Sequence, residues 1–235
     1  MAHLSHAEHI ALIDQPADYP DFLNTGLRIL APSGVYHPHE SSSTLLMVQV
    51  IKPLIHGKKV LEIGGGSGAL ALMMKLLCAC QVTVTDICEK SVATMECNAI
   101  LNKINIDVRH GHLFEPVDGA RFEVIVFNMP LLNAPVHGRA ERSLCDPGGI
   151  ILQEFLATLP EHLTSNGVAF FTHGNISAPL PIPSTGRLTV ASEHVREGGP
   201  SIRIMKWEKQ PIDARHERKH TLQVKANKKG KSCAK

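Results

Sequence analysis

Apolar residues form two kinds of pattern between residues 44 and 175. Short continuous apolar runs are typical of buried parallel strands, and apolar residues three or four positions apart are typical of amphipathic helices. The predicted strands are Lys59–Ile63, Gln81–Ile87, Ile106–His110, Val124–Phe127 and Val168–Thr172. The predicted helices are Thr44–Ile51, Ala69–Leu77, Glu89–Leu101 and Gly149–Leu163. Strands that alternate with helices indicate an α/β domain with a parallel sheet.

The pattern changes on both sides of this region. Asn166-Gly167 predicts a turn before the fifth strand, and the proline-rich residues 179–185 predict a linker. The runs at 188–195 and 202–207, joined by EGGPS, predict an antiparallel hairpin that closes the sheet. Residues 4–13 favour a short helix. We therefore divide the chain into a cap or oligomer-contact segment (1–34), a ligand-binding domain (35–210) and a basic tail (211–235).

Residues 58–87, KKVLEIGGGSGALALMMKLLCACQVTVTDI, predict a strand, a glycine turn, a helix and a second strand. Glycines at 64, 65, 66 and 68 allow a sharp turn and let a ligand lie directly on the backbone. Asp86 ends the second strand, where an acid binds the hydroxyls of a ribose. The turn and the acid together predict a nucleotide-like ligand.

Glu62 lies immediately before the glycines, and this indicates which kind of ligand binds. A phosphate does not require a carboxylate beside it. A ligand with an amino-acid end carries a cationic ammonium, which a carboxylate attracts. The spacing of Glu62, Gly64, Gly66 and Gly68 resembles motif I of class I S-adenosylmethionine (SAM) methyltransferases.

A second group of polar residues follows the fourth strand and precedes the first helix. Asn128 and Pro130 end the buried run Val124–Phe127, so a side-chain amide lies at the ligand edge of the sheet. Ser43 and Thr44 start a helix, where hydroxyls can meet a carboxylate. His37, His39 and Glu40 lack a second cluster, so we expect no metal site. His173 is a possible base or a solvated histidine.

Composition narrows the class of protein further. The 235 residues, 43% hydrophobic, are enough for one sizeable α/β core. No run approaches 18 apolar residues and no leader pattern is seen, so we expect a soluble cytoplasmic protein that does not enter membranes. The six cysteines lack zinc-type spacing and are interpreted as reduced core thiols.

The net charge of +2 is unevenly distributed. Residues 215–235 hold eight Lys or Arg and one Glu, a formal charge of +7, which leaves −5 on the rest of the chain. Such a tail can hold RNA or an acidic partner, or it can be a disordered solubilising segment. The tail has no aromatic residue for base stacking.

The order of elements and the motifs VLEIGGGSGALAL, VTDI, GHLFEP and Asn-x-Pro resemble the small-domain class I SAM methyltransferases of the release-factor glutamine and ribosomal RNA guanine type. The resemblance covers about residues 35–175 and implies a Rossmann-like, seven-stranded sheet with a terminal antiparallel hairpin. Where that family has Asn-Pro-Pro followed by an aromatic residue, this chain has Asn128, Met129, Pro130 and Leu131. His112 stands where the family usually has an aspartate at the adenine.

The resemblance also implies a site. Glu62 with Gly64, Gly66 and Gly68 would hold the amino-acid end of SAM, Asp86 and Ile87 the ribose side, and His112 and Leu113 the adenine. His37, Ser43 and Thr44 would contact the methionine carboxylate or line the site. Asn128 would also contact the cofactor, and with Pro130 it would orient the acceptor, or Asn128 would only cap its own strand end.

The expected reaction is methyl transfer from SAM to a nitrogen or oxygen of a small molecule, or to a macromolecular amide or base. Two alternatives stay open. One is a non-methylating reaction in which SAM cyclises to azetidine-2-carboxylate and releases methylthioadenosine. The other is a non-catalytic protein that binds SAM or RNA. A homodimer is also possible.

Overall fold

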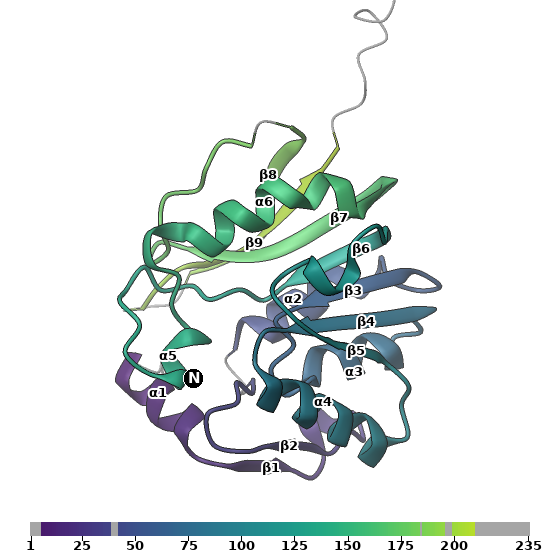
Figure 1. The fold of residues 1–235 in the computed structure, drawn as a ribbon, viewed down its shortest axis with the longest axis vertical. Helices are drawn as coiled ribbons and strands as arrows, with labels where there is room; N and C mark the ends of the chain where they lie inside the picture. Colours follow the sequence, from purple (N-terminus) through teal and green to yellow (C-terminus); the bar gives the residue numbers. More distant parts are fainter. Residues whose placement is uncertain (1–5, 39–41, 184, 196–198, 210–235) are drawn as a thin grey trace, which may run out of the picture.

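A seven-stranded sheet forms the centre of the computed structural model, which describes residues 6–38, 42–183, 185–195 and 199–209 (Figure 1). The strand order is β5-β4-β3-β6-β7-β9-β8. Strands β3 to β7 are parallel, and β9 is antiparallel to both β7 and β8. The strands are β3 (Lys59–Ile63), β4 (Gln81–Asp86), β5 (Asp107–His110), β6 (Phe122–Phe127), β7 (Leu163–Gly174), β8 (Arg187–His194) and β9 (Ile202–Glu208).

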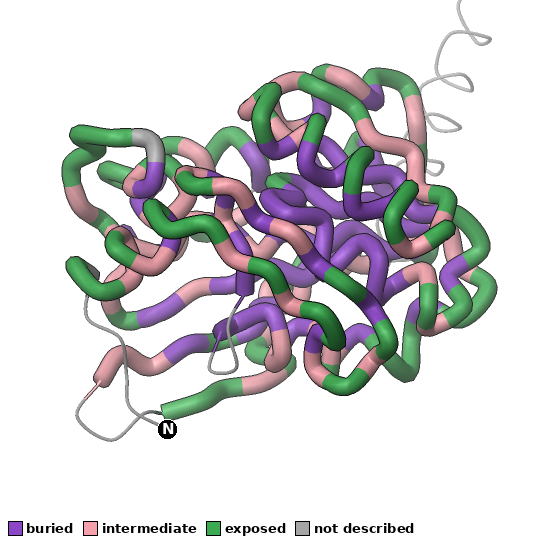
Figure 2. Tube along the Cα trace, turned by 90° about the horizontal axis from the view of Figure 1, so that it is seen from below, coloured by how far each residue is buried: buried purple, intermediate pink, exposed green. Residues whose placement is uncertain are grey.

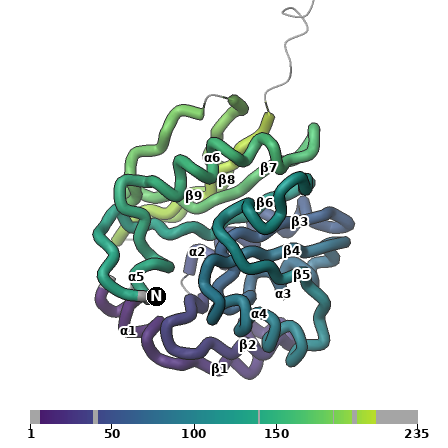
Figure 3. The backbone as a smooth tube through the Cα atoms, in the orientation of Figure 1, coloured from purple at the N-terminus to yellow at the C-terminus, as the bar shows by residue number. Residues whose placement is uncertain are grey.

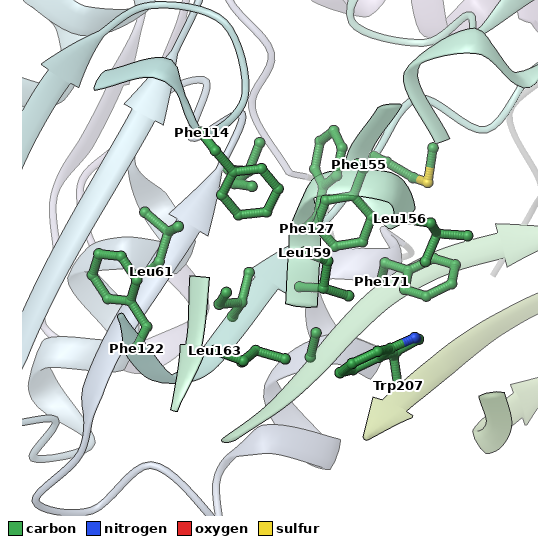
Figure 4. Packing of buried hydrophobic residues seen from close by; sticks show 14 of the residues in the cluster. Leu61, Phe114, Phe122, Phe127, Phe155, Leu156, Leu159, Leu163, Phe171 and Trp207 are labelled. Carbon is green, nitrogen blue, oxygen red and sulfur yellow. The ribbon is translucent and has the colours of Figure 1, made fainter. Parts of the chain in front are cut away.

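Helices cover both faces of this sheet. The helices are α1 (His6–Asp14), α2 (Ser43–Ile51), α3 (Ala69–Leu76), α4 (Glu89–Asn102), α5 (Arg139–Arg142) and α6 (Ile150–His162). Side chains of α2 and α3, with Met95 of α4, pack against one face. On the other face α6 contributes Phe155, which lies among Phe114, Phe127 and Phe171 (Figure 4). The buried chain is concentrated in the sheet and the inner sides of these helices (Figure 2).

The predicted seven-stranded sheet and its terminal hairpin are confirmed, whereas the turn predicted at Asn166-Gly167 is wrong. Strand β7 already begins at Leu163, which pairs with Phe122, and the register then shifts before Val168 pairs with Val124. A Cβ on Gly167 would lie 2.9 Å from the carbonyl oxygen of Phe122. The glycine therefore serves close backbone approach in an irregular strand rather than a turn.

The N-terminal segment packs against the domain through a two-stranded hairpin that the sequence did not reveal. Strands β1 (Ala17–Tyr19) and β2 (Ile29–Ala31) pair with each other and lie beside α4 (Figure 3). The short 3-10 turns η1 (Phe22–Asn24), η2 (Glu115–Val117) and η3 (Pro147–Gly149) complete the described elements. Phe22, Leu27 and Ile29 form a third core cluster with residues of α3 and α4.

Two asparagines of α4, one helical turn apart, hold this hairpin. Asn98, fully buried, accepts a hydrogen bond from the amide of Leu30 (2.9 Å) and donates to the carbonyls of Leu30 and Ser67 (2.8 Å each). Asn102 binds the amide and the carbonyl of Arg28 in the same way (2.8 and 2.7 Å). Each side chain makes the pair of backbone hydrogen bonds that a neighbouring strand would make. Through the carbonyl of Ser67, Asn98 also connects the hairpin to the glycine loop.

Replacing Asn98 with alanine is expected to lower the free energy of unfolding by about 2–3 kcal/mol, because one buried and two part-buried backbone groups lose their partner. The matched change Asn102→Ala removes similar bonds at an exposed position, where water replaces the amide. It should cost about 1 kcal/mol or less. Urea titration of both variants measures the difference, and equal losses would contradict this account.

The prediction of core thiols is wrong for most cysteines. Cys78, Cys80 and Cys97 are exposed, Cys88 is half-buried, and Cys145 is buried. The exposed ones lie in the α3–β4 turn and on the outer side of α4, because a place in or next to a helix does not by itself bury a side chain. Cys233 and the rest of the basic tail lie outside the described residues. In the part of the chain that is described, no helix is long and apolar enough to cross a membrane.

Candidate active site

The candidate site lies at the carboxyl ends of β3, β4 and β6. The strand order reverses between β3 and β6, and ligands of open α/β sheets bind at such a point. Parallel pairing brings the residues after Ile63, Thr85 and Phe127 to one edge, because Ile63 is in register with both of the others. The glycine loop, Asp86 and Asn128 therefore belong to a single site.

Asp86 is bound to the glycine loop. Its Oδ2 accepts a hydrogen bond from the amide of Gly66 and its Oδ1 accepts one from the amide of Cys88, both at 2.9 Å. Burial raises the pKa of Asp86, and the two amide hydrogen bonds oppose this shift. A carboxylate oxygen has two acceptor positions, so each oxygen keeps one for a ribose hydroxyl.

The loop needs glycine for reasons that differ from position to position. A Cβ on Gly65 would meet Val84 at 2.4 Å and Met95 at 2.5 Å, so this glycine lets α4 pack against β4. Gly66 has a φ of +56°, and a Cβ there would lie 2.8 Å from the carbonyl oxygen of Tyr36. Gly64 is exposed at the end of β3. Its backbone is accessible to a ligand.

Glu62 is a buried acid near the end of β3, immediately before the glycine loop. Its side chain is 2% exposed, and within the described residues Oε2 has no hydrogen-bond partner. Burial raises the pKa of Glu62 well above its usual range, the charge of Asp86 adds to this, and the backbone of Ala71 opposes it. A buried carboxyl oxygen without a partner is costly. It fits a cationic ligand group such as the ammonium of SAM.

Three other buried polar atoms near the loop also lack a partner among the described residues: Ser67 Oγ, Ser42 Oγ and His37 Nε2. The amide of Ser67 donates to the carbonyl of Tyr36 (2.9 Å), which joins the glycine loop to the segment that precedes α2. His37 Nδ1 lies 2.8 Å from the hydroxyl of Tyr19, and burial lowers the pKa of His37 while the backbone of Leu12 opposes this. These atoms fit the polar amino-acid end of the cofactor.

The turn at residues 111–113 lies beside Asp86. The amide of Gly111 donates to the Asp86 carbonyl (3.0 Å), and the Thr85 hydroxyl donates to the Leu113 carbonyl (3.0 Å). Ile87 is 65% exposed there and offers an apolar surface. The His112 ring is directed elsewhere, because its Nε2 lies 2.7 Å from Glu154 of α6 in a half-exposed pair.

Asn128 is held by the first two residues of α2. The Ser43 hydroxyl donates to its Oδ1 at 2.6 Å, and its Nδ2 donates to the Thr44 hydroxyl at 3.0 Å. The next carbonyl, that of Met129, accepts a hydrogen bond from the hydroxyl of Thr172 on β7 (3.2 Å). The sequence placed Asn128 at this edge but gave no sign of these partners, except that hydroxyl residues begin α2 and end β7.

Other candidates lie apart from this arrangement. Pro130 is half-buried beyond Met129 and has no side-chain polar group to offer. The Nε2 of His173 lies 3.0 Å from the carbonyl of Ala178, and His173 faces the sheet side opposite to that of its neighbour Thr172. His39 and Glu40 lie outside the described residues. Within the described residues, no group of His, Cys, Asp or Glu has the arrangement of a metal site.

The sequence of residues 26–175 matches the family described as the methyltransferase small domain. The chain belongs to this family. By sequence and by fold it falls in the class I SAM-dependent methyltransferase superfamily, and S-adenosyl-L-methionine is its cofactor, as Glu62 and the glycine loop indicated.

Individual relatives are moderately similar. The chain is 30% identical over 172 residues to a ribosomal protein L11 methyltransferase of Lactobacillus johnsonii, a match that covers 72% of this chain and 49% of the relative. It is 33% identical over 149 residues to a putative protein N5-glutamine methyltransferase of Methanocaldococcus jannaschii, covering 61% and 74%. The chain thus spans about half the length of the L11 methyltransferases that it matches.

Solved structures show the same fold. A T. thermophilus 16S rRNA methyltransferase in complex with AdoMet and guanosine has a TM-score of 0.61 with 21% identity, over 83% of this chain and 50% of that chain. The L11 methylase of Lactobacillus delbrueckii subsp. bulgaricus has a TM-score of 0.53 with 22% identity, over 75% and 83%.

Proposed function

We propose that this protein transfers a methyl group from SAM to the nitrogen of a primary amide in a polypeptide. The observation that carries the proposal is the pair of oxygens formed by Asn128 Oδ1 and the Met129 carbonyl. Both can only accept hydrogen bonds, and each already accepts one from a hydroxyl. Each therefore keeps one acceptor position for a substrate.

Two oxygens that accept hydrogen bonds favour a substrate group that carries two donor hydrogens. A planar NH₂ group can donate one N–H to each oxygen, whereas an alcohol has a single hydrogen and a carboxylate has none. Held by both hydrogens, the plane of the group is fixed and one face of its nitrogen is turned to the methyl. This supports a nitrogen acceptor over an oxygen acceptor.

Leu131 favours an amide over a nucleobase. A purine or pyrimidine exposes a wide flat face that an aromatic side chain covers well, and leucine offers no stacking surface. A side-chain amide is smaller and needs less cover. The relative of M. jannaschii, named a putative protein N5-glutamine methyltransferase, agrees with this choice.

The chain's residues would contribute binding, orientation and proton control. SAM supplies a methyl group already activated by its sulfonium. Glu62 would hold the ammonium, and Asp86 the ribose. Asn128 and Met129 would orient the acceptor at a distance of about 3 Å, and the buried surroundings would exclude water. As the N–C bond forms, the C–S bond would break with its electrons going to sulfur, which gives S-adenosylhomocysteine, and the proton released from nitrogen would pass to solvent as the products leave.

The test uses tritiated methyl-SAM and an extract of cells that lack the gene, so that the acceptor is unmethylated. Label in the protein fraction, recovered as N-methyl glutamine or asparagine after proteolysis, supports the proposal, with one S-adenosylhomocysteine formed per methyl. Label in RNA would favour a nucleobase acceptor instead. Methylthioadenosine formed without added extract would indicate cyclisation, and SAM binding with neither product would indicate a binding protein.

We also propose that the basic tail holds an acidic or RNA-containing partner that carries the acceptor. Replacing its eight Lys and Arg with glutamine should weaken binding to such a partner and flatten its salt dependence, because fewer counterions are released. A variant with the same tail residues in scrambled order keeps the charge and is the control. Methylation of a short glutamine peptide should be unchanged in both. Loss of that activity would contradict a tethering role.

A further inference from the structure

Three hydroxyl side chains contact the Asn128 amide and the Met129 carbonyl, whose oxygens are proposed to bind the substrate NH₂ group. The methyl transfer itself does not need these hydroxyls. Ser43 and Thr44 contact the Asn128 amide, at 2.6 and 3.0 Å, and Thr172 contacts the Met129 carbonyl at 3.2 Å. All three are buried, and Thr172 is fully so. Ser43 and Thr44 lie in the first turn of α2, and Thr172 lies near the carboxyl end of strand β7.

The register of the sheet explains this arrangement. Phe127 of β6 pairs with Phe171 of β7, so the next residues, Asn128 and Thr172, lie side by side where the pairing ends. Beyond that point the backbone of Met129 has no strand partner given by the sheet. The hydroxyl of Thr172 replaces the missing ladder bond and fixes the direction of the carbonyl.

The direction of the Asn128 side-chain amide is likewise not set by the sheet. A terminal amide rotates broadly about its last torsion, so an isolated side chain would point its oxygen in many directions. Ser43 and Thr44 bind the two ends of the amide from one helical turn, which restricts rotation and leaves one N–H and one oxygen acceptor position for other partners.

We propose that Ser43, Thr44 and Thr172 are positioning residues that hold the Asn128 oxygen and the Met129 carbonyl in the geometry that binds the acceptor NH₂ group. This rests on the proposed function. Two of the three, Ser43 and Thr44, begin α2, and the third, Thr172, belongs to β7.

Kinetics test the role of Thr172 first. Thr172→Val keeps the shape and removes the hydroxyl, and we expect kcat to fall about tenfold or more because the carbonyl is misdirected, with the KM for SAM unchanged. Thr172→Ser restores the hydroxyl and should recover most of kcat. Thr83→Val is the control, a buried strand threonine that bonds Asp107 instead (3.3 Å). The acceptor is the protein fraction of the gene-deleted extract.

Two spectroscopic signals test the contacts without any acceptor. In protein labelled with carbonyl-¹³C methionine, the Met129 signal, identified by its loss in Met129→Leu, should shift in Thr172→Val and return in Thr172→Ser. The Asn128 side-chain NH₂ signals, identified by their loss in Asn128→Ala, should shift in Thr44→Val and Ser43→Ala. The control Thr83→Val should leave both signals in place.

The outcomes separate the two proposals. Unshifted signals in the hydroxyl variants would overturn the positioning role and leave the proposed function standing. Shifted signals with undiminished kcat would also overturn the positioning role, because turnover would then not depend on the direction of the two oxygens. If the wild type methylates no amide, the proposed function fails, and the signals alone decide whether the three hydroxyls hold the two oxygens. Urea unfolding of each variant shows whether lost turnover reflects lost folding.

Discussion

Replacing Asn128 with alanine is expected to lower kcat about a hundredfold while the affinity for SAM stays within about twofold of the wild type. The amide carries one of the two oxygens that orient the acceptor, and alanine leaves the NH₂ group free to rotate away from the methyl. The residues proposed to hold the cofactor, Glu62, Gly66 and Asp86, belong to β3, the glycine loop and β4 and not to the end of β6. Turnover with tritiated SAM and isothermal titration of SAM give the two numbers.

A matched control for this change is Asn102→Ala, which removes another hydrogen-bonded asparagine far from the carboxyl edge. Its turnover should equal that of the wild type. If Asn128→Ala loses SAM affinity and turnover by the same factor, Asn128 belongs to the cofactor contacts instead. If it loses neither, the amide only caps its strand and helps anchor α2 through Ser43 and Thr44.

Replacing Glu62 with glutamine is expected to weaken SAM binding by about 2–5 kcal/mol, a factor of about 30 or more, without destabilising the protein free of SAM. The carboxylate is buried, and its Oε2 has no hydrogen-bond partner within the described residues. Glutamine has nearly the same shape but no charge for the ammonium. Glu123→Gln, a surface change at the opposite edge of the sheet, should leave SAM affinity unchanged.

The pH dependence of stability gives an independent check on Glu62. Its pKa in the folded protein is raised, so the folded state binds a proton that the unfolded state has already released. The stability from Glu62 is therefore fully present below the ordinary pKa of 4.5 and is lost as pH rises through the folded pKa.

Thermal unfolding of the SAM-free protein across this range should show that loss in the wild type. The Glu62→Gln variant should lack it and be at least as stable at neutral pH. The affinity of the wild type for SAM should rise over the same pH range, because the ionised carboxylate binds the ammonium. Identical pH profiles for the two proteins would contradict the assignment of Glu62.

The cofactor side of the site was largely predictable because its signals are local in sequence. Gly64 to Gly68 follow a strand directly, and Asp86 ends the next strand in the chain. Parallel neighbours bring their carboxyl ends together whatever the rest of the fold does. The contact between Gly66 and Asp86 thus follows from two adjacent strands and one helix.

The acceptor side was predictable only in part. Asn128 was placed at the right edge by its strand, but its partner Ser43 is 85 residues away in the chain. The backbone of His112 was expected to hold the adenine, and nothing in the sequence indicated that the ring of His112 pairs with Glu154, 42 residues away. Neither contact leaves a periodic pattern, since a hydrogen bond between distant side chains depends on how elements pack and not on spacing.

The N-terminal hairpin illustrates the same limit. Strands of three residues are too short for an alternating pattern, and the edge they form is paired by Asn98 and Asn102 rather than by another strand. The packing of this segment against α3 and α4 gives it its structure.

The sequence by itself therefore determined the sheet, the glycine loop and the two acids beside that loop, because each depends on neighbouring elements and on local backbone needs. The tertiary structure decided how the acceptor oxygens are held. Their direction depends on hydroxyls from α2 and β7, which reach Asn128 and Met129 only after the whole sheet has formed.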